Sequence, residues 1–207
     1  MTCSATLRSS SRLSALCGLA FLALACGSGG TAAPGRSFAD LTNPYLGVEQ
    51  SSWLVGPVSR LATPEEIDQY LQIRDDAQAE AFIQQFWDRH DATPDRPGNP
   101  LREAFEERSA QADRLYSEAG YLGRRTDRGT IYVLYGAPKT VDFEVAPIPD
   151  DPPIEVWVYG SDSPAGLDGR RPVGQYRFTR RGDLTVIYVP RNLDDPRMRR
   201  QPPGYGS

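Results

Sequence analysis

Residues 76–90 read DAQAEAFIQQFWDRH, and this stretch decides the helical half of the fold. Its apolar residues recur three and four positions apart, which is the period of a helix with one buried face. An aspartate at position 75 or 76 stands where such a helix begins, because a short acceptor side chain can cap its free N–H groups. We expect a core-facing helix whose buried face carries Ala79, Phe82, Ile83, Phe86, Trp87 and His90.

Start signals for two further helices flank this stretch. Upstream, residues 63–66 (TPEE) combine a capping threonine, a proline at the first helical position and the glutamate of a capping box, so a short helix should run to about Ile73. Downstream, residues 99–100 (NP) repeat the cap-and-proline signal and predict a helix to about Glu118. Its buried face should carry Leu101, Phe105, Ala112, Leu115 and Tyr116.

Beyond Gly120 the apolar period changes from helical to alternating. Two alternating runs flank the turn residues RRGD at 180–183, which predicts a hairpin. Because helices precede strands, we predict an α+β domain, in which two or three helices pack on one face of a small, mainly antiparallel sheet. The expected strands are Trp53–Val58, Thr130–Tyr135, Ile154–Tyr159, Gln175–Thr179 and Leu184–Val189.

The N-terminal residues have the pattern of an export signal. Two arginines, Arg8 and Arg12, precede the apolar run Leu13–Ala25, which has the length of a signal-peptide core and is too short to span a bilayer. The run ends in LALAC at residues 22–26, which resembles the recognition sequence of lipoprotein signal peptidase. We expect cleavage before Cys26 and lipid on that cysteine, and the alternative is an ordinary signal peptide that leaves Cys26 free.

These signals predict four segments along the chain. Residues 1–25 are the signal peptide, 26–36 a Gly/Ser-rich flexible linker, 37–190 a single folded domain and 191–207 a disordered tail rich in Pro, Gly and Arg. Lipid chains on Cys26 would anchor the domain to a membrane. Gly27 follows the cysteine in place of aspartate, which favours the outer membrane where a cell has two.

Composition excludes several classes of site. The chain has 207 residues and a formal net charge of −4, and an acidic protein repels nucleic-acid phosphates. Its three cysteines are Cys3, Cys17 and Cys26, so the expected domain has no cysteine nucleophile or cysteine metal site. His90 is the only histidine, which excludes a multi-histidine site. We expect no metal and no cofactor.

Three blocks of the chain resemble a known family. They are FWDRHDATP at residues 86–94, GRRTDRG at 123–129 with the following IYVLYGAP at 131–138, and EVWVY at 155–159. These blocks make the chain similar to the GWxTD domain family over roughly residues 79–189. The family is common in exported bacterial proteins and has no assigned catalytic residues, so the resemblance implies export and a shared fold. Arg124 stands where the name-giving tryptophan is expected.

The stretch 123–129 allows a functional and a structural interpretation. As a ligand site it would use a loop between a helix and a strand, where sites often lie. As a structural turn it would have Asp127 accept hydrogen bonds from N–H groups of its own turn, while Arg124 lies at the surface with its head in water. We predict the structural turn. The residues of this stretch singled out in either interpretation are Gly123, Arg124, Thr126, Asp127, Arg128 and Gly129.

Other chemistry-bearing residues have simpler structural interpretations. His90 is expected to cap a helix end rather than act as a general acid or base, because no nucleophile or metal ligand accompanies it. The acids Asp88, Asp91 and Asp95 lack the spacing of a calcium-binding loop. The tripeptide RGD at 181–183 is explained by turn chemistry rather than by adhesion.

Aromatic residues on the predicted strands are a candidate binding face. Trp157 and Tyr159 share one face of a strand whose other face is aliphatic, and Tyr132 lies on the neighbouring run. They form either an exposed aromatic platform for a protein, peptide or glycan, or part of a sheet covered on both faces.

The combined expectation is a membrane-anchored lipoprotein of the cell envelope. Its domain should be a non-enzymatic protein-interaction or scaffolding module with a protein partner in the envelope and no nucleic-acid partner. The alternative is an envelope hydrolase that uses the loop of Asp127 and Arg128.

Overall fold

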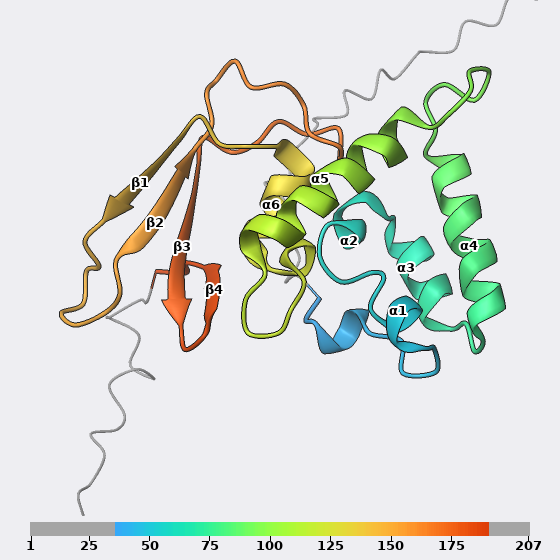
Figure 1. Cartoon of the computed structure of the whole chain (residues 1–207), viewed down its shortest axis with the longest axis horizontal. Helices are drawn as coiled ribbons and strands as arrows, with labels where there is room; N and C mark the ends of the chain where they lie inside the picture. Colours follow the sequence, from blue (N-terminus) through green and yellow to red (C-terminus); the bar gives the residue numbers. More distant parts are fainter. Residues whose placement is uncertain (1–35, 191–207) are drawn as a thin grey trace, which may run out of the picture. The chain divides into compact units, whose positions relative to one another are not determined.

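A computed structural model describes residues 36–190 of the chain, and Figure 1 shows their helices followed by a sheet. The predicted α+β class is confirmed, because six α-helices precede a four-stranded antiparallel sheet of order β1-β2-β3-β4. The helical elements are η1 Ala39–Leu41, α1 Val48–Ser51, α2 Val58–Leu61, α3 Pro64–Leu71, α4 Asp76–Arg89, α5 Pro100–Tyr116, η2 Gly123–Arg125 and α6 Asp127–Tyr135. The strands are β1 Thr140–Glu144, β2 Ile154–Val158, β3 Gln175–Arg181 and β4 Leu184–Ile187.

The predicted helix starts are confirmed by their caps. Thr63 Oγ1 accepts the backbone N–H of Glu66 at 3.2 Å, and the Glu66 carboxylate accepts that of Thr63 at 3.0 Å, so α3 begins with a complete capping box. Asp75 caps α4 and Asn99 caps α5, each by accepting an N–H three residues ahead. These caps place the helices that the sequence predicted.

Two of the predicted strands are wrong. Residues 53–57 form turns that lead into α2, which begins at Val58, and residues 130–135 lie in α6. The apolar residues of α6 are buried on all sides because the helix contacts α5, η2 and β4. A helix without a polar face has no amphipathic period in its sequence, so its pattern resembles that of a buried strand.

Strand β1 was missed in the sequence. It is only five residues long, every one of them is exposed, and it follows directly on the loop after α6. The predicted strand at 154–159 and the hairpin are confirmed as β2, β3 and β4, and Gly182 has a φ of +59° in the turn of that hairpin.

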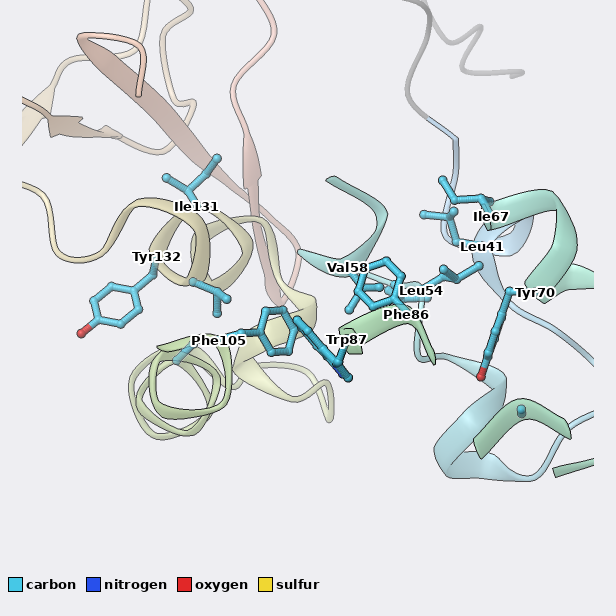
Figure 2. Packing of buried hydrophobic residues seen from close by; sticks show 14 of the residues in the cluster. Leu41, Leu54, Val58, Ile67, Tyr70, Phe86, Trp87, Phe105, Ile131 and Tyr132 are labelled. Carbon is cyan, nitrogen blue, oxygen red and sulfur yellow. The ribbon is translucent and has the colours of Figure 1, made fainter. Parts of the chain in front are cut away.

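Aromatic side chains join the helices into one core. Figure 2 shows Trp87 of α4 between Phe86 of the same helix and Phe105 of α5. The ring centroids of Phe86 and Trp87 are 5.1 Å apart, and those of Trp87 and Phe105 are 5.0 Å apart. Phe86 is fully buried and Trp87 is 3% exposed, so the predicted buried face of α4 is confirmed at these residues. Leu115, predicted to be buried on α5, is 60% exposed, and that prediction is wrong.

The sheet covers the helices with one of its faces. Trp157 of β2 and Phe178 of β3 lie on this face, with centroids 5.0 Å apart, and Tyr116 of α5 packs 5.3 Å from Trp157. Both sheet residues are essentially buried, so this contact fixes the sheet against α5.

The predicted signal peptide, Cys26 with most of its linker, and the tail at 191–207 lie outside the described residues. Within residues 36–190, no helix has the length and apolar character needed to cross a membrane.

Candidate functional site

The stretch 123–129, here called the motif segment, forms η2 and the first turn of α6 instead of a loop before a strand. Thr126 caps α6, because its Oγ1 accepts the N–H of Gly129 at 3.1 Å and donates to the carbonyl of Gly123 at 2.8 Å. Thr126 thus has the turn-closing role that the sequence assigned to Asp127. Its side chain is buried, so the cap is part of the packed interior.

The two glycines of the motif segment allow backbones to touch. A Cβ atom on Gly123 would lie 1.9 Å from the carbonyl oxygen of Ala112 in α5. A Cβ atom on Gly129 would lie 1.8 Å from the carbonyl oxygen of Gly123. Residues with a side chain therefore cannot occupy either position while α5, η2 and α6 keep these contacts.

Arg124 has an acidic partner, which the sequence did not predict. Its Nε donates to Asp113 Oδ2 at 2.8 Å, and its backbone N–H donates to Asp113 Oδ1 at 2.8 Å. The Arg124 side chain remains 40% exposed, as expected for a surface residue, but its head is ion-paired to α5. A guanidinium with a carboxylate partner replaces the aromatic residue of the family name.

Asp113 carries a pH dependence that follows from this pair. Burial alone would raise the pKa of Asp113, but the hydrogen bonds and charge of Arg124, together with nearby Arg125, hold it below the ordinary range. A lowered folded-state pKa stabilises the fold above the unfolded value of about 4 and loses that contribution as the pH falls through the folded value.

We predict that Asp113→Asn lowers the free energy of unfolding by about 1–2 kcal/mol at pH 7, the usual effect of removing a charged hydrogen-bond partner. The difference from wild type should shrink below about pH 4, where the Asp113 carboxyl of the unfolded wild-type chain becomes protonated and the stabilising contribution is lost. Denaturation followed by circular dichroism at pH 3 and pH 7 measures both values. An equal deficit at both pH values would contradict the ion-pair assignment.

Two carboxylates satisfy the outer edge of β4. The backbone N–H of Thr185 donates to Glu118 Oε1 at 2.9 Å, and that of Ile187 donates to Asp127 Oδ2 at 2.6 Å. The N–H of Tyr188 donates instead to Arg177 of β3, and strand residues alternate between neighbours, so those of Thr185 and Ile187 point away from the sheet. The prediction that Asp127 bonds its own turn is wrong: its carboxylate holds a strand sixty residues away.

Arg128 lies between two glutamates at the same junction. Its Nη1 donates to Glu155 of β2 at 3.2 Å and its Nη2 donates to Glu118 at 3.1 Å. The guanidinium also lies 5.4 Å from the centroid of the Tyr116 ring, and Trp157 Nε1 donates to the other oxygen of Glu155 at 2.7 Å. The side chains of Arg128, Glu118 and Glu155 are only 21%, 11% and 17% exposed, so this is a largely buried network.

A hollow of about 180 Å³ opens beside the motif segment. It brings Asp127 and Glu118 into one concavity, which is the arrangement expected of an acid–base pair. However, Glu118 accepts from Thr185 with both oxygens and from Arg128, and Asp127 accepts from Ile187, so both carboxylates already have structural partners. The hollow is lined by Phe38, Glu118, Tyr121, Arg125, Thr126, Asp127, Leu184, Thr185 and Val186.

The candidate aromatic platform is not an exposed surface. Trp157 is 1% exposed, Tyr159 5% and Tyr132 9%. The hydroxyl of Tyr159 donates to the carbonyl of Gly136 at 2.8 Å and that of Tyr132 to Gln111 at 2.6 Å. Trp157 lies on the face of the sheet that packs on the helices, and Tyr132 lies in the buried helix α6. The binding-face interpretation is therefore wrong.

The remaining candidates have structural partners. His90 ends α4, where its ring lies 4.3 Å from that of Phe86 and its Nε2 is 3.1 Å from Glu66 Oε2. Asp91 caps a turn by accepting the N–H of Thr93. Across residues 36–190, no group of three or more acidic, histidine or cysteine side chains is arranged to hold a metal ion.

The sequence did not identify Asp113, Glu118, Glu155 or Thr185 as partners of the motif segment. Arg128 is 10 residues from Glu118 and 27 from Glu155, and Thr185 is 67 residues from Glu118. Only the packing of the sheet on α5 and α6 brings them together. The one local signal was Glu118, an acidic residue two positions after the end of α5.

Comparison with known proteins gives one result. No curated protein and no solved structure matches this chain. A family model described as the GWxTD domain matches residues 26–168, which is more than half of the chain. The match includes the motif segment, all six helices and the first two strands. The chain therefore belongs to the GWxTD domain family.

Proposed function

We propose that this chain is a membrane-anchored lipoprotein of the cell envelope whose folded part is a non-enzymatic interaction or scaffolding domain. The observation that carries the proposal is the bonding of two carboxylates, one in the motif segment and one just before it. Glu118 and Asp127 accept hydrogen bonds from β4, and Arg128 is held between Glu118 and Glu155. Residues held in this way connect the sheet to the helices, and a rigid domain of this kind suits a role in binding.

The anchor part of the proposal rests on the N-terminal sequence. LALAC at residues 22–26 places a cysteine directly after a signal-peptide core. Two or more lipid chains on Cys26 would hold the domain stably at a membrane, and residues 27–35 would serve as the tether.

We predict that Cys26→Ser abolishes incorporation of labelled palmitate and releases the protein from the membrane fraction. The thioether through which lipid attaches needs the cysteine sulfur, and a serine hydroxyl does not replace it. Cys17→Ser is the matched control, because it lies within the predicted leader and should leave labelling unchanged. A wild-type chain that takes up no lipid, with a Cys26→Ser variant that stays membrane-bound, would contradict the anchor.

A second candidate is an envelope hydrolase that uses Asp127 and Arg128. The hollow of about 180 Å³ favours it, because it holds Asp127 and Glu118 together. The structural partners of both acids weigh against it, since a general acid or base must exchange a proton with substrate.

The two candidates differ in what Asp127→Asn should do. As a structural residue, Asp127 should give a variant of lower melting temperature that captures the same partners from its own envelope at a permissive temperature. Asp183→Asn, at the 89% exposed hairpin turn, is the matched control. A variant that melts like wild type but has lost partner capture or turnover of envelope material would favour the hydrolase.

A further inference from the structure

The two edge strands of the sheet differ in whether their outward backbone groups have partners. On β4, the outward N–H groups of Thr185 and Ile187 are satisfied by Glu118 and Asp127. Strand β1 is the opposite edge, where Figure 1 shows it at the outer margin of the sheet. Within residues 36–190, no strand pairs with its outer side. Open edges of this kind are templates for pairing with another chain.

The hydrogen-bond alternation identifies which groups of β1 point outward. The N–H of Tyr159 donates to Gly174, so the odd-numbered residues of β2 bond β3 and the even-numbered ones bond β1. Val156 is opposite Asp142 in the register, and Val158 is opposite Thr140. The even-numbered residues of β1 therefore bond β2, and the N–H and C=O groups of Val141 and Phe143 point out of the sheet.

The same two residues present apolar side chains to solvent. Val141 is 47% exposed and Phe143 is 69% exposed, and Val145, which continues the row, is 94% exposed. The intervening Asp142 projects from the other face and is also exposed. Glu144, the second acid of that face, pairs with Arg177 at 3.0 Å, which leaves Asp142 as the acid at the centre of the strand.

We propose that β1 is a docking edge for an extended peptide segment of a protein partner, in which apolar residues alternate with basic ones. This inference rests on the interaction role proposed above and names its site. The backbone of the segment pairs with the outward groups of Val141 and Phe143. Its apolar side chains pack beside theirs, and a basic side chain stands opposite Asp142, since opposite charges across a strand pair stabilise it.

In two of the registers that two β1 strands could adopt, charge disfavours a second copy of this chain as the occupant. Antiparallel pairing of two β1 strands centred on Asp142 places that carboxylate opposite itself. Pairing centred on Phe143 places Asp142 opposite Glu144. Like charges directly opposite each other destabilise a strand pair, whereas a lysine or arginine in a different chain complements Asp142.

The test uses the full chain in detergent micelles. The probes are labelled peptides of five residues in which valine and lysine alternate. Fluorescence anisotropy should show saturable binding. N-methylation of the valines, whose N–H groups would face β1, should abolish binding, while N-methylation of the lysines should preserve it. Equal binding of the two methylated peptides, or none of the unmodified peptide, would overturn the proposal.

A charge exchange tests the register. Asp142→Lys should weaken binding of the valine–lysine peptide about fivefold. It should strengthen binding of a peptide in which glutamate replaces each lysine by a similar factor. Asp183→Lys, at the distal turn of the β3–β4 hairpin, should leave both affinities unchanged. An Asp142→Lys variant with wild-type preferences, or with a changed sedimentation-derived oligomeric state, would overturn the assignment of the edge to a basic partner segment.

Failure of this inference is distinguishable from failure of the interaction role. If wild type and Asp142→Lys capture the same protein from the native envelope with equal yield, the edge assignment is wrong and the interaction role stands. If neither captures a protein and neither binds the peptide, both proposals are wrong.

Discussion

Gly129→Ala is expected to prevent stable folding of this domain. The added Cβ would lie 1.8 Å from the carbonyl oxygen of Gly123 and 2.5 Å from its carbon. Both are backbone atoms of η2, which is itself pressed against α5, so no flexible side chain can move aside. Overpacking against movable side chains already costs about 1–3 kcal/mol, and we expect at least the upper value here.

That loss is a large part of the roughly 5–15 kcal/mol by which a domain is stable. Soluble yield and thermal melts of the full chain measure it. Gly123→Ala should behave similarly, because its Cβ would lie 1.9 Å from the carbonyl oxygen of Ala112. Gly174→Ala is the matched control, since nothing lies within 4 Å of its Cβ, and its effect should stay within about 0.5 kcal/mol. A Gly129→Ala variant that melts like this control would show that η2 and α6 are not in backbone contact.

The helical half of the fold was predictable because its signals are local. Thr63 with Glu66, Asp75 and Asn99 each cap a helix through residues no more than three positions away. The hairpin between β3 and β4 was predictable for the same reason. Its turn needs only a glycine with positive φ at position 182, between two alternating runs.

Helix α6 was not predictable from its own residues. The run Ile131–Leu134 is apolar and rich in β-branched and aromatic residues, which is typical of a strand. It folds as a helix because Thr126 caps it and because α5 and the sheet bury it from several sides. Local propensity favoured one structure and tertiary burial selected the other.

The sequence singled out the motif segment, but it did not identify the partners of that segment. Thr126, Asp127 and Arg128 stood out as a group of turn and charged residues. Each now has a specific contact: a helix cap, a strand edge and two glutamates. The prediction for the aromatic face of β2 was wrong for a different reason. Alternation showed that Trp157 and Tyr159 share a face, but only the packed helices show that this face is covered.

Arg128→Met is expected to lower the free energy of unfolding by about 3–5 kcal/mol. Methionine fills much of the space of the arginine stem, so the change removes the charge more than the packing. Glu118 and Glu155 are then left as two nearly buried carboxylates without their common cation. Breaking a buried ion pair on one side has this cost because the remaining charge is neither solvated nor paired.

The same reasoning predicts which second changes restore stability. Glu118→Gln and Glu155→Gln remove the unpaired charges, while the amide oxygens can still accept from Thr185 and from Trp157 Nε1. Added to Arg128→Met, they should recover most of the lost free energy, because a buried ion network is often replaceable by neutral groups of similar volume. Arg180→Met, whose side chain is 60% exposed, is the matched control and should change stability by less than about 0.5 kcal/mol.

Chemical denaturation of the full chain measures this coupling directly when wild type, Arg128→Met, the triple variant and Arg180→Met are compared at one pH. A triple variant no more stable than Arg128→Met alone would mean that the arginine acts through its stem, by packing on Tyr116, and not through its charge. Recovery in the triple variant would show that charge balance at the junction of α6, β2 and β4 is what the motif arginine supplies. The sheet would then be attached to the helices by this network and by the two carboxylates that hold β4, which leaves β1 as the edge available to a partner.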